Sequence, residues 1–228
     1  MKNDFEIGFE MECVLDQRVY NKIQLQPELD KICRGIKIDD DDSIEEYDIP
    51  DDEAADKGYV YTAELVTPPK PTEEAMIVLK KMFALIDKGG WTNESTGLHI
   101  NISPIDKKLF KKMNYLYIAF HPLFEEIAGA YNRDSNSFSM PNDLTSLPVN
   151  LWENLVSECT DGISIYHEKE AAVNLDYVGS NYGRTRRIEV RAFGNKDYQK
   201  KLVLTRNYTY KILEVLRNSV KYNFDYMK

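Results

Sequence analysis

The chain has 228 residues, of which 43% are hydrophobic and 11% aromatic, so its composition excludes a disordered protein. Its formal net charge of −9 makes a broad basic surface for nucleic acid unexpected. Three scattered cysteines form no disulfide framework, no apolar signal core opens the chain, and no apolar run is long enough to span a bilayer. We therefore expect a cytoplasmic protein without membrane or nucleic-acid partners, folded as one domain over residues 1–228.

The first part of the chain predicts a strand, a helix and a loop. Residues 4–15 alternate between apolar and other side chains with period two, which is typical of a strand with one buried face. Residues 21–35 predict a weak helix. An acidic stretch of little periodicity follows at residues 38–58, and we expect it to form a loop or an excursion between strands.

The rest of the chain mixes short strands with helices. The pattern predicts a strand at 59–69, a helix at 73–88 and a strand at 96–103. A helix follows from Asp106 to about residue 130, and we expect Pro122 to kink or divide it. The remaining predicted elements are a helix at 151–159, strands at 171–178 and 186–194, and a final helix at 198–220. We expect Thr72 and Asp197 to cap the helices that follow them. Short strands that are polar on one face favour an α+β fold, in which helices cover the other face of an antiparallel sheet.

The polar faces of these strands carry an unusual set of side chains. They are Glu10 and Glu12 on the first strand, Glu64 on the next, His99 and Asn101 on the third, and Arg187, Glu189 and Arg191 on the last. Carboxylates crowded on one surface repel each other unless cations intervene, and hard divalent cations with oxygen ligands are their natural partners. A histidine adds a nitrogen ligand that Mn²⁺ accepts, and arginines bind phosphate oxygens bidentately. Together these groups indicate phosphoryl-transfer chemistry.

Each motif also has a purely structural interpretation. A Glu-x-Glu pair on a strand is usually a solvated face, and Arg-Ile-Glu-Val-Arg could form cross-strand ion pairs. Gly8 interrupts the polar face of the first strand, where we expect a ligand or another backbone to approach closely. The order in which the motifs follow one another favours a functional site.

This ordered set resembles the putative amidoligases, a branch of the glutamine-synthetase-like carboxylate–amine ligases, over residues 5 to 195. The matching segments are Gly8-Phe9-Glu10-Met11-Glu12, Asp42-Ser43-Ile44, Glu64-Leu65-Val66-Thr67-Pro68-Pro69, Gly97-Leu98-His99, Lys169 through Asn174, and Arg187-Ile188-Glu189-Val190-Arg191. The resemblance implies a glutamine-synthetase-like catalytic fold, with a curved, mostly antiparallel sheet, helices packed on one face and the active site on the other.

The resemblance also implies roles for the matched residues. The metal ligands would be Glu12 and Glu64 for the ion nearer the acceptor carboxylate, with Asp42 as a further ligand, and Glu10, His99 and Glu189 for the ion nearer the ATP phosphates. Arg187 and Arg191 would be catalytic and contact the phosphates or the acyl-phosphate, while Lys169 and Asn174 would help to bind the nucleotide. The match at Asp42 lacks the glycine of the family's Asp-Gly-Ser, and Arg133 resembles a further family arginine.

The activity implied by the resemblance is ATP-dependent amide-bond formation through an acyl-phosphate. It would use Mg²⁺ or Mn²⁺, with two or more ions, and its partners would be carboxylate and amine substrates that are small molecules, peptides or protein side chains. Two alternatives stay open on the same fold. One is a guanidino-kinase-like phosphotransferase, and the other is a non-catalytic module that binds metal or nucleotide.

Overall fold

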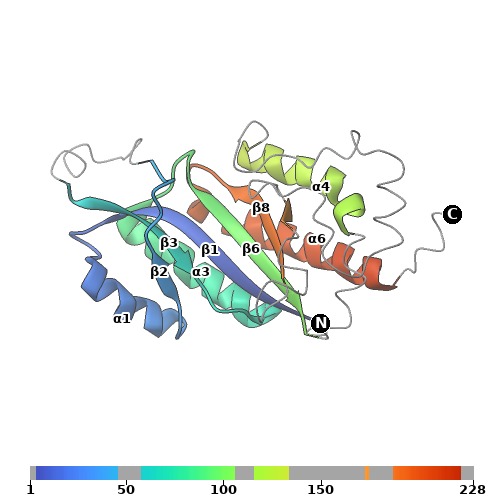
Figure 1. Cartoon of the computed structure of the whole chain (residues 1–228), viewed down its shortest axis with the longest axis horizontal. Helices are drawn as coiled ribbons and strands as arrows, with labels where there is room; N and C mark the ends of the chain where they lie inside the picture. Colours follow the sequence, from blue (N-terminus) through green and yellow to red (C-terminus); the bar gives the residue numbers. More distant parts are fainter. Residues whose placement is uncertain (1–3, 46–57, 106–115, 134–172, 175–186, 222–228) are drawn as a thin grey trace.

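The computed structural model of the chain describes residues 4–45, 58–105, 116–133, 173–174 and 187–221 (Figure 1). The strands in these residues are β1 (Phe5–Asp16), β2 (Lys37–Asp39), β3 (Val60–Val66), β4 (Lys70–Pro71), β5 (Gly90–Trp91), β6 (Gly97–Pro104), β7 (Val173–Asn174) and β8 (Ile188–Gly194). The helices are α1 (Lys22–Ile32), α3 (Thr72–Gly89), α4 (Leu116–Tyr131) and α6 (Leu202–Lys221), with a short 3-10 helix, η3 (Tyr198–Lys200), before α6. None of these helices is long and apolar enough to cross a membrane.

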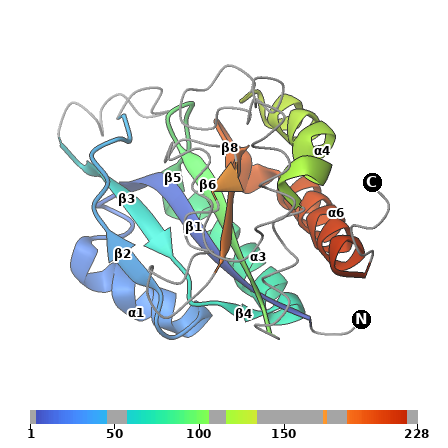
Figure 2. The same cartoon turned by 45° about the vertical axis from the view of Figure 1, so that its right-hand side comes forward.

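The strands form one open sheet in the order β2-β3-β1-β6-β8-β7, and β4 and β5 also pair with β1. Figure 2 shows β3, β1, β6 and β8 side by side. Every pairing among the described strands is antiparallel. The sheet and its helices therefore confirm the predicted α+β architecture.

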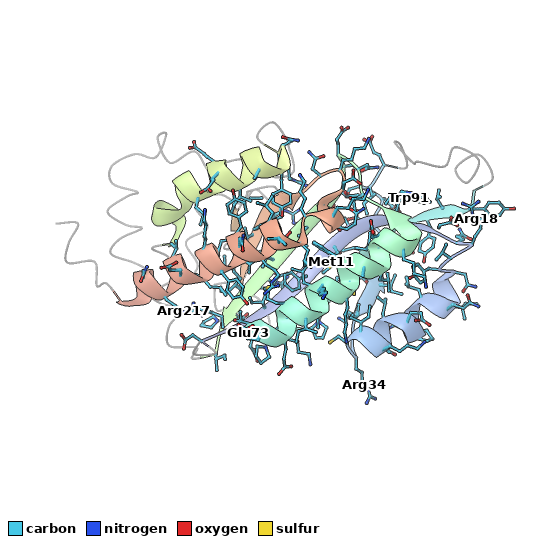
Figure 3. The ribbon with its side chains drawn as sticks, turned by 180° about the vertical axis from the view of Figure 1, so that it is seen from behind. Met11, Arg18, Arg34, Glu73, Trp91 and Arg217 are labelled. Carbon is cyan, nitrogen blue, oxygen red and sulfur yellow. The ribbon has the colours of Figure 1, made fainter. Side chains whose placement is uncertain are left out.

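β1 lies inside the sheet, and its period-two pattern decides which face is buried. Phe5, Ile7, Phe9 and Met11 are at most 1% exposed and share one core with the apolar side of α3. Figure 3 views the molecule from this side, where α3 and α6 lie across the strands and Met11 is seen between them. Full burial of such a side chain contributes about 1.5–3 kcal/mol. Because successive side chains of a strand point to opposite faces, this burial commits the glutamates of β1 to the other face.

The helix starts differ from the predictions in two places. α3 begins at Thr72, whose hydroxyl donates to the carbonyl of Phe5 on the neighbouring strand and does not cap the helix. Asp197 has a left-handed backbone before η3 and pairs with Lys200 Nζ at 2.8 Å, so it does not cap α6. α4 runs without a break through Pro122, so the proline does not divide the helix, and a kink there stays a prediction.

Several predicted features lie wholly or partly outside the described residues. They are the helix at 151–159, the start of the preceding helix at Asp106, and the strand at 171–178 except for β7.

β6 and β8 pair with an irregular register that the sequence pattern did not predict. Leu98 lies opposite Phe193 while Ile100 lies opposite Val190, so β8 has one more residue than β6 between these two pairs. A bulge of this kind bends the strand and re-aims its side chains. It allows Phe193 to enter the core after Val190, while Arg191 still contacts the polar face.

Candidate active site

The strand registers bring the predicted polar residues together on one face of the sheet. Pairing of β1 with β3 places Glu12 opposite Glu64, and pairing of β1 with β6 places Glu10 opposite His99. Pairing of β6 with β8 adds Glu189 to the same face. Residues that are far apart in the sequence thus become neighbours because the sheet order interleaves their strands.

Within the part of the chain that the structure describes, two groups of three possible ligands form there. Ligand atoms of Glu10, His99 and Glu189 lie within 4.8 Å of one another, and so do those of Glu12, Glu64 and His99. The imidazole belongs to both groups. Its Nδ1 lies 3.3 Å from Glu10 and 3.5 Å from Glu189, and its Nε2 lies 3.4 Å from Glu12. The first grouping is the one that the resemblance implies. The second contains Glu12 and Glu64 as implied, but with His99 where the resemblance has Asp42. The role of these residues as metal ligands stays a prediction.

Gly97 has no side chain, and this leaves room for the group formed by Glu12, Glu64 and His99. A Cβ at this position would lie 2.8 Å from His99 Nε2 and 3.0 Å from Glu12 Oε2. The backbone N–H of Gly97 also donates to Glu12 Oε2 at 2.5 Å. The glycine of Gly-Leu-His therefore has a physical reason, since a side chain would enter the site itself.

Gly8 is needed for a different close approach. A Cβ on Gly8 would lie 3.1 Å from the carbonyl oxygen of Thr67, just before Pro68 and Pro69. The Thr67 hydroxyl accepts the N–H of Phe9 at 2.8 Å, which holds the segment against β1. The expectation of a close approach is confirmed, and the approaching group is another backbone.

The crowding of carboxylates changes the protonation of Glu64. Burial raises the pKa of Glu64 to about 7, and the negative charges of Glu10 and Glu12 add to this effect. The Glu64 carboxyl therefore keeps its proton at pH values where an ordinary glutamate is ionised. This indicates an excess of negative charge that a bound cation would compensate.

Glu10 behaves in the opposite way because it has polar partners. Burial alone would raise the pKa of Glu10, but the hydrogen bond and charge of His99, with Arg187, outweigh burial and lower it. Asn101 Nδ2 donates to Glu10 Oε1 at 2.9 Å. Sequence analysis placed Asn101 on the polar face with His99 but assigned it no role.

The arginine just before β8 and the arginine within it have different environments. Arg187 Nη2 lies 3.6 Å from Glu10 Oε1, and its side chain is 26% exposed. Arg191 is buried, and its Nη1 donates to Glu189 Oε1 at 2.7 Å. Arg187 can therefore meet a ligand that enters from solvent, whereas Arg191 orients a carboxylate of the site.

The remaining predicted site residues are not brought into the two groups. Asp42 is exposed in the turn after β2, and Asp41 is the acid of that turn whose charge reaches Glu64. Asn174 lies in β7, opposite Glu189 in the backbone register. Lys169 lies outside the described residues.

A cavity of about 280 Å³ lies beside the site and is lined by Glu10 but not by Glu12. Lys37 and Arg187 give it two cationic groups. Its apolar wall comes from Val66, Pro68 and Pro69. Lys37 was not predicted as a site residue. The sequence gives no sign that the short strand at the start of the acidic stretch borders the site.

The donor chemistry fits divalent cations such as Mg²⁺ or Mn²⁺. Each group offers two carboxylates and one imidazole nitrogen. Hard cations prefer oxygen ligands, and Mn²⁺ also accepts a histidine nitrogen. The raised pKa of Glu64 agrees with this fit, since a cation would favour its ionised form.

The Gly97→Ala protein is expected to bind Mn²⁺ at least tenfold more weakly, because the added methyl group displaces His99 and Glu12. Calorimetric titration with Mn²⁺ measures this loss. The matched control is Gly129→Ala in α4, where a Cβ has no neighbour within 4 Å among the described residues. That variant should bind Mn²⁺ as the wild type does, and equal affinity in the Gly97 variant would contradict the assignment.

Comparison with known families matches residues 7–143 to a family model described as putative amidoligase enzyme. The matched region is more than half of the chain and contains β1, β3 and β6, with Glu10, Glu12, Glu64 and His99. Glu189 lies beyond it and joins the site through the sheet. A search of curated proteins finds no match to the chain.

Proposed function

The chain belongs to the putative amidoligase enzyme family, and from this premise we propose that it is an ATP-dependent carboxylate–amine ligase that forms an amide bond through an acyl-phosphate. The observation that carries the proposal is the pair of ligand groups that share His99, beside Arg187 and a cavity. We further propose that the sheet is the catalytic sheet of a glutamine-synthetase-like fold.

The proposed reaction has two steps, because a free carboxylate must be activated before an amine can attack it. Direct attack would have to expel oxide, which is a very poor leaving group. Transfer of the γ-phosphoryl group of ATP to a carboxylate oxygen releases ADP and gives an acyl-phosphate. The amine nitrogen then attacks the carbonyl carbon, phosphate leaves with the former carboxylate oxygen, and an amide remains.

In this proposal, each group of ligands holds an ion that serves one of the two substrates. Glu10, His99 and Glu189 would hold the ion nearer the triphosphate, and Glu12 and Glu64 would hold the ion nearer the acceptor carboxylate. Bound divalent cations would supply charge neutralisation between two anionic substrates and Lewis-acid polarisation of the transferred group. The cavity supports this division, because it borders Glu10 and so offers space on the nucleotide side.

The arginines and polar side chains complete the proposed site. Arg187 is the partly exposed cation beside Glu10, and it would bind phosphate oxygens through its planar fork. Arg191 would keep Glu189 in place through their 2.7 Å bond and add positive charge near the acyl-phosphate. Lys169 and Asn174 would contact the nucleotide. The substrates would be a carboxylate and an amine of a small molecule, a peptide or a protein side chain.

Binding of a non-hydrolysable ATP analogue should require Mg²⁺ or Mn²⁺, because the carboxylates alone repel a triphosphate. Calorimetry should give an affinity at least about 100-fold lower in EDTA than with Mg²⁺, which corresponds to about 2.7 kcal/mol. Equal binding in EDTA would contradict a cation-bridged nucleotide site. The same titration with AMP serves as a control. AMP lacks the β- and γ-phosphates that the cations would bridge, so its binding should depend much less on Mg²⁺.

Turnover with labelled carboxylates tests the reaction itself. A screen of carboxylate and amine pairs with ATP should release ADP and phosphate, and ¹⁸O from the carboxylate should appear in the phosphate. Phosphate without ¹⁸O would contradict the acyl-phosphate. A phosphorylated guanidine product would instead identify a phosphotransferase, and metal binding without any turnover would identify a binding module.

A further inference from the structure

Arg133 is a charged side chain that lies beneath the candidate site and is only 1% exposed. It follows the end of α4. Asn132 there adopts a left-handed backbone with φ of 54°, and the N–H of Arg133 donates to the carbonyl of Ala128. This helix end turns the chain so that the guanidinium reaches the segment before β6. Gly194 makes room for it, since a Cβ there would overlap Arg133 Nη1.

One peptide group connects this guanidinium to the site. The carbonyl oxygen of Thr96 accepts Arg133 Nη1 at 2.9 Å and the backbone N–H of Asn195 at 2.8 Å. The N–H of the same peptide, from Gly97, donates to Glu12 Oε2 at 2.5 Å. A cation therefore lies at the oxygen of the peptide and a carboxylate lies at its N–H.

The cation at the carbonyl oxygen strengthens the hydrogen bond that the N–H of the same peptide donates. A cation at a carbonyl oxygen polarises the peptide and makes its N–H a stronger donor. A hydrogen bond from a strong donor to a carboxylate is short and holds its acceptor firmly. Because Oε2 of Glu12 is held in this way, Oε1 is the oxygen that faces His99 Nε2, at 3.4 Å.

We propose that Arg133 is a positioning residue that orients the Glu12 carboxylate through the Thr96–Gly97 peptide. Its role in metal binding rests on the function proposed above, whereas the hydrogen-bonded chain does not. Burial of the guanidinium carries a cost, since burial lowers the pKa of Arg133 to about 10 while Glu12 opposes this shift. An apolar side chain would fill the same space without that cost, so a charge-dependent task accounts for the arginine.

The test compares Arg133→Met and Arg133→Lys with Lys201→Met. Lys201 is the matched control, because its Nζ contacts the carbonyl of Ala130 at the end of α4 but not the Thr96–Gly97 peptide. Calorimetry with Mn²⁺ measures both ions, and Glu64→Gln identifies which constant belongs to the Glu12 group. Arg133→Met should weaken that ion about tenfold or more, as loss of a ligand's supporting hydrogen bond does, with a smaller loss in Arg133→Lys. Lys201→Met should leave both constants unchanged.

A second measurement does not depend on a bound ion. The amide proton of Gly97 in the metal-free wild type should resonate far downfield, and it should move upfield in Arg133→Met. An unchanged Gly97 resonance in a folded Arg133 variant would overturn the proposal, and so would an ordinary Gly97 shift in the wild type. Absence of Mn²⁺ binding in the wild type would instead contradict the proposed function, and the Gly97 resonance would still decide the role of Arg133.

Discussion

The His99→Asn protein is expected to lose at least about 10³-fold in kcat/KM, or about 4 kcal/mol of transition-state stabilisation. Among the described residues, His99 alone belongs to both groups of possible ligands, so its loss removes a donor from each. Initial rates of ADP release and titration with Mn²⁺ measure the effect, and circular dichroism checks the fold.

Two single-group variants give this prediction its control. Glu10→Gln should weaken mainly the ion of the Glu10 group, and Glu64→Gln should weaken mainly the ion of the Glu12 group. The His99 variant should weaken the ion of the Glu10 group, to which the proposal assigns the imidazole, and a loss at the Glu12 group as well would show that the imidazole serves both. If His99→Asn left the Mn²⁺ constant of the Glu10 group unchanged, or if turnover were unaffected, the proposed role of the imidazole would be excluded.

The polar face of the site could be predicted because strand alternation is a local property. Once Phe9 and Met11 are taken as core residues, Glu10 and Glu12 must lie on the other face. The same argument places His99 from its apolar neighbours. Which strands lie next to one another depends on the register and order of the sheet, and no local pattern encodes them. The motif order supplied that information here, through the resemblance to a family.

Other parts of the site could not be predicted, because they depend on an irregular strand register or on contacts to backbone atoms. The bulge of β8 adds one residue between two cross-strand pairs, so alternation through Ala192 would leave Phe193 outside the core, where the structure buries it. Arg133 contacts Thr96 over 37 positions of sequence, through a bond to a backbone carbonyl that could belong to any residue. The hydroxyl of Tyr198 likewise donates to the carbonyl of Glu12 at 2.8 Å. Contacts to backbone atoms leave no signature in residue type.

These backbone contacts also explain how a strand can carry crowded carboxylates. Glu12 is held at its carboxylate by Gly97 and at its carbonyl by Tyr198, so two elements from distant parts of the chain fix its orientation. Glu10 is held at its carboxylate by the side chains of Asn101 and His99. Such fixed carboxylates lose little side-chain freedom when a cation binds, which favours binding by a preorganised site. Glu64 is the member of the cluster whose burial and like-charged neighbours raise its pKa.

The metal-free protein is expected to lose stability as the pH rises from about 4.5 to about 7 because of Glu64. The pKa of Glu64 is 4.5 in the reference state and about 7 in the folded protein, so the folded state binds more protons within this window. Its contribution is full below the lower value and is lost above the higher one. Since the carboxyl is partly exposed and solvent screens its charge, we expect a loss of about 1–2 kcal/mol, or a few degrees in Tm.

Glu64→Gln isolates this effect, because the amide has nearly the same shape and does not titrate. Thermal melts in EDTA at pH 5 and pH 8 should give a smaller fall in Tm for the variant than for the wild type. Glu126→Gln is the control, since that exposed carboxylate pairs with Lys211 and its pKa is lowered, mainly by this hydrogen bond. It should retain the wild-type fall between pH 5 and pH 8, as its own titration lies below the window. Mn²⁺ should remove most of the wild-type fall, because a cation favours the ionised Glu64. An equal fall in wild type and Glu64→Gln would mean that another group titrates, and the charge excess would then have to lie elsewhere.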